Sequence, residues 1–179
     1  GITTREIDVD VEAFIVAKKA RSAFKGYRGF PATVCTSINE EVVHGIPSSK
    51  RRLKEGDIIG LDLGCIVDGY YADCAITLPV GPVPPRVQEL LDVTRESLDK
   101  AIVQCRAGNR LGDISHAVQA HCESHGFGVV RAFVGHGIGT RMHEEPQIPN
   151  YGRPGQGSRI DEGMVIAIEP MITAGSGSV

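Results

Sequence analysis

Apolar residues are most concentrated in two neighbouring stretches of the first half of the chain. Residues 58–63 and 66–67 are rich in Ile, Leu and Val, and residues 70–78 follow with an apolar and aromatic composition. The dipeptide Asp68-Gly69 between them is a preferred turn sequence for antiparallel strands. These stretches therefore predict a β-hairpin.

A helical repeat of apolar residues marks the start of the chain. Thr3 and Glu6 have the spacing of a capping box, in which two side chains bind the free N–H groups at a helix start. The apolar positions that follow are Ile7, Val11, Phe14 and Ile15. We expect this helix to end near residues 25–26, where a glycine follows a lysine.

A Pro-rich break at residues 81–85 separates two parts with a similar order of elements. Two further helices are expected after the break, over residues 85–106 and 113–125. Further strands are expected over residues 30–39, 129–134 and 164–172. This order indicates an α+β fold with two halves, about residues 1–81 and 82–179, in one catalytic domain.

Two carboxylates interrupt the apolar hairpin. Asp62 is flanked by leucines, and Asp73 lies between Ala72 and Cys74. An ionised carboxylate in a mostly apolar strand is costly unless its charge is cancelled, and two nearby carboxylates repel each other. A divalent metal would remove both costs, whereas the alternative is a pair of edge-strand aspartates that face water.

Two other polar residues stand in similar surroundings later in the chain. His136 lies in the glycine-rich segment 135–139, expected to be a turn, and Glu169 interrupts the apolar run 164–172. Taken alone, His136 would be an ordinary turn histidine. With Asp62 and Asp73, however, the set offers only oxygen and imidazole ligands, which suit Mn, Fe(II), Co or Zn in a hydrolytic centre.

Composition narrows the class of protein. The 179 residues are 41% hydrophobic and 23% charged, with a net charge of −3. No block of basic residues argues for nucleic acid as the main partner, since the basic run at residues 50–52 is short. Five cysteines without a CxxC pair indicate free thiols in a reducing compartment, so we expect a cytoplasmic protein. The sequence has no run of 18 apolar residues, so we expect no membrane-spanning segment.

One further histidine pair has the spacing of a zinc-binding helix. His121 and His125 are at positions i and i+4 of the last predicted helix. In the H-E-x-x-H motif a glutamate follows the first histidine, whereas here Cys122 follows it. We interpret the pair as a solvated helix end.

The motifs in combination resemble the methionine aminopeptidases, type I, of the pita-bread fold. Asp62 and Asp73 are 11 residues apart, and the His-Glu-Glu-Pro-Gln run that begins at His143 follows the glycine-rich segment. The Ile-Glu-Pro-Met run around Glu169 completes the set. Residues 39–47, Asn-Glu-Glu-Val-Val-His-Gly-Ile-Pro, are the most specific to that family.

The resemblance implies a role for each residue. Two divalent ions (Co, Mn, Fe or Zn) would be held by Asp62, Asp73, His136 and Glu169. Glu169 would also carry the proton of the attacking water, His143 would stabilise the oxyanion, and His44 would contact the scissile amide. Tyr27, Phe30, Cys35 and Met142 would line the pocket for a methionine side chain.

The resemblance also implies two segments that the sequence does not contain. The family has a first helix ahead of the position of Gly1, and a further bridging glutamate in a strand beyond Glu169. We therefore expect a pita-bread fragment, truncated at both ends, in which two pseudo-symmetric halves combine helices with antiparallel strands. With four of five expected ligands, low or no turnover by these residues is expected.

The expected function is removal of the initiator methionine from nascent chains whose second residue is small. The expected partners are the N-termini of nascent polypeptides or peptides, with proximity to the ribosome, no membrane and a monomeric state. One alternative is an Xaa-Pro aminopeptidase or prolidase, although residues 44–47, His-Gly-Ile-Pro, argue against it. The other is a non-catalytic pita-bread binding protein.

Overall fold

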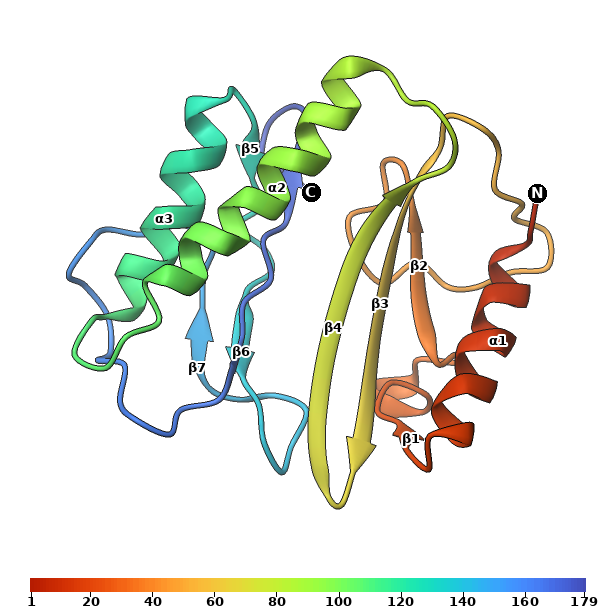
Figure 1. The fold of residues 1–179 in the computed structure, drawn as a ribbon, viewed down its shortest axis with the longest axis horizontal. Helices are drawn as coiled ribbons and strands as arrows, with labels where there is room; N and C mark the ends of the chain where they lie inside the picture. The colour runs from red at the N-terminus through yellow and green to blue at the C-terminus, as the bar shows by residue number, and fades with distance from the viewer. The chain divides into compact units, whose positions relative to one another are not determined.

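The computed structural model describes residues 1–179 and divides them into two compact units. Unit 1 consists of Gly1–Pro84 and Gly139–Met142, and unit 2 consists of Pro85–Ile138 and His143–Val179. Each unit combines α-helix with antiparallel strands (Figure 1), so the predicted α+β class is confirmed. That both units form one catalytic domain stays a prediction.

Helix α1 (Thr4–Ala17) begins with the predicted capping box. The Glu6 N–H donates to the Thr3 hydroxyl over 3.2 Å, and the Thr3 N–H donates to the Glu6 carboxylate over 2.7 Å. The predicted end near residues 25–26 is wrong. The helix ends because Lys19 adopts a left-handed conformation with φ of 59°, after which β1 (Arg21–Ser22) starts.

The buried face of α1 differs from the predicted apolar stripe. Ile15 is buried as expected, but Phe14 is 64% exposed. The helix instead turns Thr4, Asp8 and Ile15 inward. Thr4 and Asp8 are buried because they form hydrogen bonds with backbone groups of neighbouring segments. The periodicity of apolar residues does not predict such hydrogen bonds.

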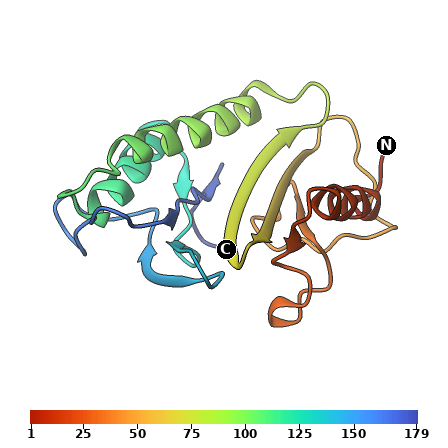
Figure 2. The same cartoon turned by 60° about the horizontal axis from the view of Figure 1, so that its bottom comes forward.

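Four strands build the sheet of unit 1: the short β1 with β2 (Val34–Ile38), β3 (Ile58–Val67) and β4 (Tyr70–Pro79). Strand β3 lies between β4 on one side and β1 with β2 on the other. The predicted hairpin is confirmed, and it is long and curved in Figure 2. Its turn residues Asp68 and Gly69 both have positive φ, 51° and 85°, as a type I′ turn requires.

Strand β2 is shorter than the predicted strand over residues 30–39. The short 3-10 turn η1 (Tyr27–Gly29) precedes it, and the Phe30 N–H donates to the Tyr27 carbonyl over 2.9 Å. Phe30 thus belongs to this turn rather than to the ladder. Helix α1 lies against β1 and β2 (Figure 1).

Helices α2 (Pro85–Val103) and α3 (Leu111–Ser124) pack side by side in unit 2 (Figures 1 and 2). The two predicted helices are confirmed to within a few residues. Their buried residues form a core with Val93, Ala101, Ile114, Val118 and Cys122 among its members. No helix of the chain combines the length and apolar character needed to cross a membrane.

The strands of unit 2 are short and form two sheets. Strand β5 (Gly128–Val129) pairs with β9 (Ile172–Thr173), whereas β6 (Gly135–Gly137) lies between β7 (Glu144–Ile148) and β8 (Ile166–Ala167). The continuous strands predicted over residues 129–134 and 164–172 are therefore wrong. In each case the chain leaves one sheet and enters the other.

Two features explain this arrangement. Pro170 lacks the N–H that a ladder between β8 and β9 would need. His136 lies in strand β6 rather than in the expected turn, and its glycines allow close strand pairing. A Cβ atom on Gly137 would lie 2.2 Å from the Glu145 carbonyl oxygen, and one on Gly135 would lie 2.3 Å from that of Ala167.

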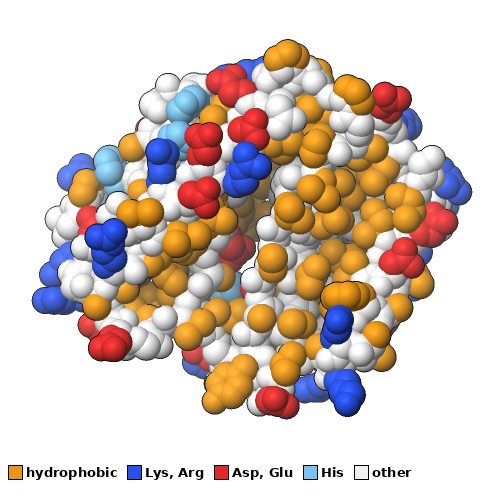
Figure 3. All heavy atoms as spheres, viewed as in Figure 1, with side chains coloured by type: hydrophobic (Ala, Val, Ile, Leu, Met, Phe, Trp, Pro, Cys, Tyr) orange, Lys and Arg blue, Asp and Glu red, His pale blue; other side chains and the backbone are white.

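Unit 1 also carries a group of exposed apolar side chains on its hairpin. Tyr70, Ile76 and Leu78 of β4 and Val67 of β3 are largely exposed. Figure 3 shows hydrophobic side chains gathered over unit 1. The hairpin is therefore less completely covered than its apolar sequence suggests.

Candidate functional site

The two hairpin carboxylates share one face of the sheet in unit 1. Asp62 of β3 lies opposite Ala75, and Asp73 of β4 lies opposite Gly64. Residues directly opposite, and residues two apart, point to the same face, so Asp62 and Asp73 are diagonal neighbours. Both are half-buried. Two carboxylates in this relation repel each other unless a cation lies between or beside them.

Cys35 and His44 lie beside these carboxylates. Cys35 of β2 is the residue directly opposite Asp62. Burial and, to a smaller extent, the charges of Asp62 and Asp73 raise the pKa of the Cys35 thiol to about 12, although a hydrogen bond from the His44 N–H acts in the opposite direction. The thiol is therefore neutral at physiological pH, which suits the wall of a pocket and not a nucleophile.

The segment that carries His44 is attached to the outer edge of β2. The Thr36 N–H donates to the Gly45 carbonyl over 2.7 Å, and the Gly45 N–H donates to the Ser37 hydroxyl over 3.1 Å. A Cβ atom on Gly45 would lie 2.2 Å from the Thr36 carbonyl oxygen. His44 has a φ of 60° and is exposed. The glycine permits this close approach, which places His44 next to the strand of Cys35.

His136 and Glu169 face each other in unit 2. The Nδ1 atom of His136 lies 2.8 Å from the Gly137 carbonyl, which can only accept, so Nδ1 carries the proton and a neutral ring keeps its lone pair on Nε2. That Nε2 lies 3.2 Å from the Glu169 Oε1. The Oε1 atom is buried and has no hydrogen-bond partner, since the approach of Nε2 lacks hydrogen-bond geometry.

This pair fits a divalent cation. Two atoms that both present lone pairs repel each other at such a distance, and a buried carboxylate oxygen without a partner is costly. A metal ion bound by both atoms removes both penalties. The Nδ1 hydrogen bond to a carbonyl is also the arrangement that orients metal-ligating histidines.

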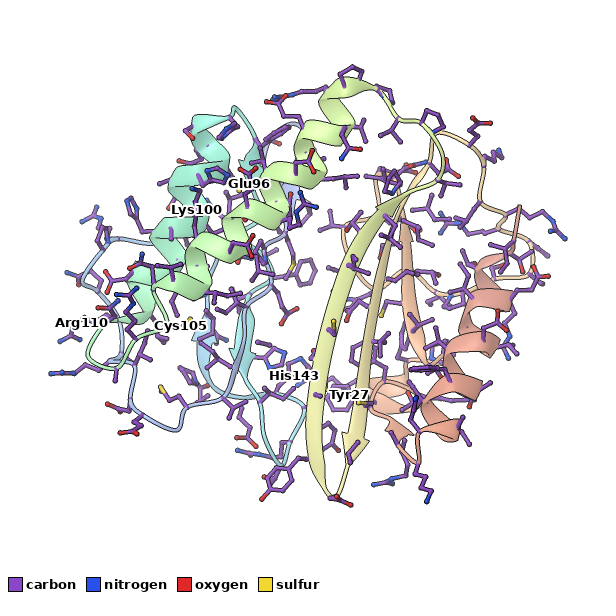
Figure 4. All side chains as sticks on the ribbon, viewed as in Figure 1. Tyr27, Glu96, Lys100, Cys105, Arg110 and His143 are labelled. Carbon is purple, nitrogen blue, oxygen red and sulfur yellow. The ribbon has the colours of Figure 1, made fainter.

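Asn150 and His143 complete the surroundings of this pair. The Asn150 side chain is buried, and its Nδ2 donates to the Glu169 carbonyl over 2.6 Å, which fixes the backbone of Glu169. The His143 ring centroid lies 4.3 Å from that of His136, at a tilt of 49°. His143 precedes β7 and is labelled in Figure 4. An exposed imidazole thus lies next to the pair.

The structure divides the predicted site residues between the two units. Asp62, Asp73 and His44 belong to unit 1, whereas His136, His143 and Glu169 belong to unit 2. All four predicted pocket residues belong to unit 1, with Cys35 and Met142 buried and the other two, Tyr27 and Phe30, half-buried. The roles of all these residues stay predictions.

Sequence reasoning missed Asp8 and Asn150. Both are almost completely buried and bind backbone groups of segments that hold site residues. Asp8 has a local signal, because it shares a helix face with Val11 and Ile15. Asn150 has none, since its partner Glu169 is distant in sequence.

The His121–His125 pair is only in part the solvated helix end that the sequence indicated, because His125 is exposed at the end of α3 whereas His121 is not. The His121 Nε2 lies 3.0 Å from the Oε2 of Glu96 on α2, and the His121 side chain is mostly buried. The Nδ1 of His125 lies 2.9 Å from the His121 carbonyl. Glu96 is labelled on α2 in Figure 4. His121 therefore links α3 to α2.

The whole chain matches a family of known proteins. The model of metallopeptidase family M24 matches residues 1–179. This chain belongs to family M24. The M24 chain is 53% identical to the methionine aminopeptidase of Clostridium acetobutylicum over 176 residues, which cover 98% of the chain and 70% of that relative. It is 52% identical to methionine aminopeptidase 1 of Bacillus subtilis, with 98% and 71% covered.

Solved structures agree with this membership. The M24 chain matches the methionine aminopeptidase of Thermotoga maritima with a TM-score of 0.97 and 47% identity, covering 99% of the chain and 71% of that structure. A prolidase of Pyrococcus horikoshii matches with a TM-score of 0.80 and 26% identity, covering 95% and 46%. These matches confirm the predicted resemblance and the pita-bread fold, and they identify the chain as a metallopeptidase.

Proposed function

We propose that the chain is an aminopeptidase that removes an N-terminal methionine when the second residue is small. Its metal ligands would be Asp62 and Asp73 from unit 1 with His136 and Glu169 from unit 2. We propose two divalent ions, because four ligands of which three are carboxylates suit a bridged pair. Family membership supports a divalent metal, and the number of ions is part of the proposal.

One observation carries the metal assignment. The His136 Nε2 and the Glu169 Oε1 lie 3.2 Å apart, and the Glu169 atom is buried without a hydrogen-bond partner. In a non-catalytic protein without metal, a polar side chain would normally satisfy such an oxygen. The arrangement therefore fits two ligands of one divalent ion.

The protein side chains then have separable tasks. When bound, divalent ions lower the pKa of a water and polarise a carbonyl. The Glu169 carboxylate accepts the proton of the attacking water and delivers it to the leaving amine. The His143 imidazole, next to His136, donates to the developing oxyanion. His44 contacts the nitrogen side of the scissile amide from its place beside β2.

The pocket for the methionine side chain would lie in unit 1. Cys35 and Met142 are buried, and the Tyr71 N–H donates to the Gly139 carbonyl over 2.7 Å, which ties the segment of Met142 to β4. Soft sulfur atoms and aromatic rings suit a flexible thioether. Tyr27 and Phe30, on and after the η1 turn, would complete the wall.

Peptide cleavage tests this function directly. The purified chain is incubated with Mn(II) or Co(II) and the peptides Met-Ala-Ser, Met-Leu-Ser and Ala-Pro-Ser, and products are identified by mass spectrometry. We expect methionine release from Met-Ala-Ser only. Cleavage of Ala-Pro-Ser would favour a prolidase, and metal binding without any cleavage would favour a non-catalytic binding protein.

A matched pair of variants ties the result to the site. Glu169→Gln removes the carboxylate that faces His136, whereas Glu162→Gln makes the same change at an exposed position. We expect Glu169→Gln to reduce metal affinity roughly tenfold or more, as loss of a ligand does, and Glu162→Gln to leave it unchanged. Isothermal titration with Mn(II) measures both. Equal affinities would contradict the assignment.

The cellular location and the partners are further parts of the proposal. All five cysteines are free thiols, which is typical of a reducing compartment and supports a cytoplasmic location. Arg51 pairs with Glu41, and Arg52 donates to the Gly1 carbonyl, so the basic run has internal partners. Proximity to the ribosome and a monomeric state stay predictions. Co-sedimentation with ribosomes checks the first, and size-exclusion chromatography checks the second.

A further inference from the structure

Asp8 is a fully buried charge in the second turn of α1. Its exposed fraction is 0%, although ionised carboxylates are rarely buried without partners. The Asp8 Oδ2 accepts from the Arg5 guanidinium over 2.6 Å. Its Oδ1 accepts from the N–H groups of Thr33 over 2.7 Å and Val34 over 3.2 Å. Both oxygens of this carboxylate thus accept hydrogen bonds.

The two amides mark the start of strand β2. Val34 pairs with Leu63 of β3, and the other edge of β2 faces no strand. Along that outer edge the Val34 N–H is bound by Asp8, and the Thr36 N–H is bound by the Gly45 carbonyl. These two acceptors take the place of a neighbouring strand, so they define where the edge strand lies.

Cys35 lies between the two bound amides. It is 3% exposed, it faces Asp62 across the ladder, and its sulfur accepts from the His44 N–H. Any movement of residues 33–36 therefore moves Cys35 relative to Asp62 and loosens the contact with His44. Asp8 touches none of the proposed reacting groups, but it holds the strand that carries one pocket wall.

We propose that Asp8 is a positioning residue that sets strand β2 and thereby places Cys35 and His44 beside the hairpin carboxylates. For its effect on catalysis, this inference rests on the proposed function. The pocket wall contacts the methionine side chain equally in the ground state and the transition state. Loss of its placement therefore weakens substrate binding more than it slows the chemical step.

Three variants test the proposal. Asp8→Ala leaves the Thr33 and Val34 amides without an acceptor, whereas Asp8→Asn keeps one oxygen for them, because the half-exposed Arg5 can turn into solvent. Asp10→Asn removes an exposed carboxylate from the same helix and is the control. We expect Asp8→Ala to raise KM for Met-Ala-Ser roughly tenfold with kcat within about twofold.

The conservative variant should recover most of this loss. We expect Asp8→Asn to raise KM by about threefold or less, and Asp10→Asn to leave both constants unchanged. Unchanged KM in Asp8→Ala would overturn the proposal even if the melting temperature fell, because a purely stabilising role predicts that result. A loss confined to kcat would overturn it as well.

Thiol labelling tests the same inference without turnover. Cys35 and Cys122 are both buried, but they belong to different units. We expect Asp8→Ala to speed alkylation of Cys35 by iodoacetamide about tenfold while Cys122 keeps its rate, as local loosening and not global unfolding requires. Mass spectrometry locates the label. Equal acceleration at both cysteines, or at neither, would overturn the proposal.

The two readouts separate this inference from the proposed function. Suppose that Cys35 is labelled selectively in Asp8→Ala, and that the wild-type chain binds metal but cleaves no peptide. These two results together would contradict the aminopeptidase and support the role of Asp8 in placing β2. Methionine release with the same kinetic constants in Asp8→Ala and wild type would support the aminopeptidase and contradict the role of Asp8.

Discussion

Glu6 is a carboxylate whose ionisation supports a helix end. Hydrogen bonds from the Thr3 hydroxyl and the Thr3 N–H lower the pKa of Glu6 below its ordinary value of 4.5. The stability that Glu6 contributes is therefore present above the ordinary value, and it is lost as the pH falls through the lowered pKa of the folded state.

Acid titration of stability checks this contribution. We expect Glu6→Gln to lose less stability than the wild type between about pH 6 and about pH 3, because glutamine does not titrate. Thr3→Ala should cost about 1 kcal/mol near neutral pH, as loss of an N-cap does. Urea unfolding at each pH measures both effects. Asp10→Asn is the control. If the free energy of unfolding of Glu6→Gln fell with decreasing pH as much as that of the wild type, the contribution assigned to Glu6 would be refuted.

Strand β6 depends on glycines at positions where a side chain has no room. A Cβ atom on Gly137 would lie 2.2 Å from the Glu145 carbonyl oxygen, so Gly137→Ala must separate β6 from β7. We expect a loss of about 1–3 kcal/mol in the free energy of unfolding, the range for overpacking. The variant should also bind Mn(II) more weakly, because His136 lies in this strand.

Gly175→Ala is the matched control, since nothing lies within 4 Å of its added Cβ and its φ is not positive. Urea unfolding and titration with Mn(II) give the two readings for both variants. Equal stabilities for Gly137→Ala and Gly175→Ala would show that β6 can separate from β7 at no cost, contrary to the expectation.

The elements that local sequence predicted are those with local causes. The turn at Asp68 and Gly69 needs only two residues with positive φ, and the capping box needs only Thr3 and Glu6. These signals are complete within a few residues, so no tertiary information was needed.

The elements that sequence misplaced have distant causes. Asp8 is buried because amides of β2 lie against α1, and His136 is in a strand because β7 and β8 bind it from both sides. The candidate ligands themselves were predicted from their chemistry, as charged or imidazole groups in apolar or glycine-rich stretches. The prediction of one continuous strand over residues 164–172 was wrong because apolar composition does not show which sheet each residue joins.

The proposed ligand set makes one demand on the two units together. Asp62 and Asp73 come from unit 1, and His136 and Glu169 come from unit 2. An ion that binds the folded state through both units stabilises both, by about 2.7 kcal/mol at a free concentration one hundred times the Kd. A site confined to His136 and Glu169 would stabilise unit 2 alone.

Hydrogen exchange followed by mass spectrometry distinguishes these cases. In the wild-type chain we expect Mn(II) to slow exchange of peptides around Val34 in unit 1 and around Val118 in unit 2. Asp73→Asn should reduce the effect in both units, whereas Asp99→Asn, at an exposed position of α2, should not. If Asp73→Asn kept full protection of unit 2, the ion would bind without Asp73, and the shared centre would be excluded.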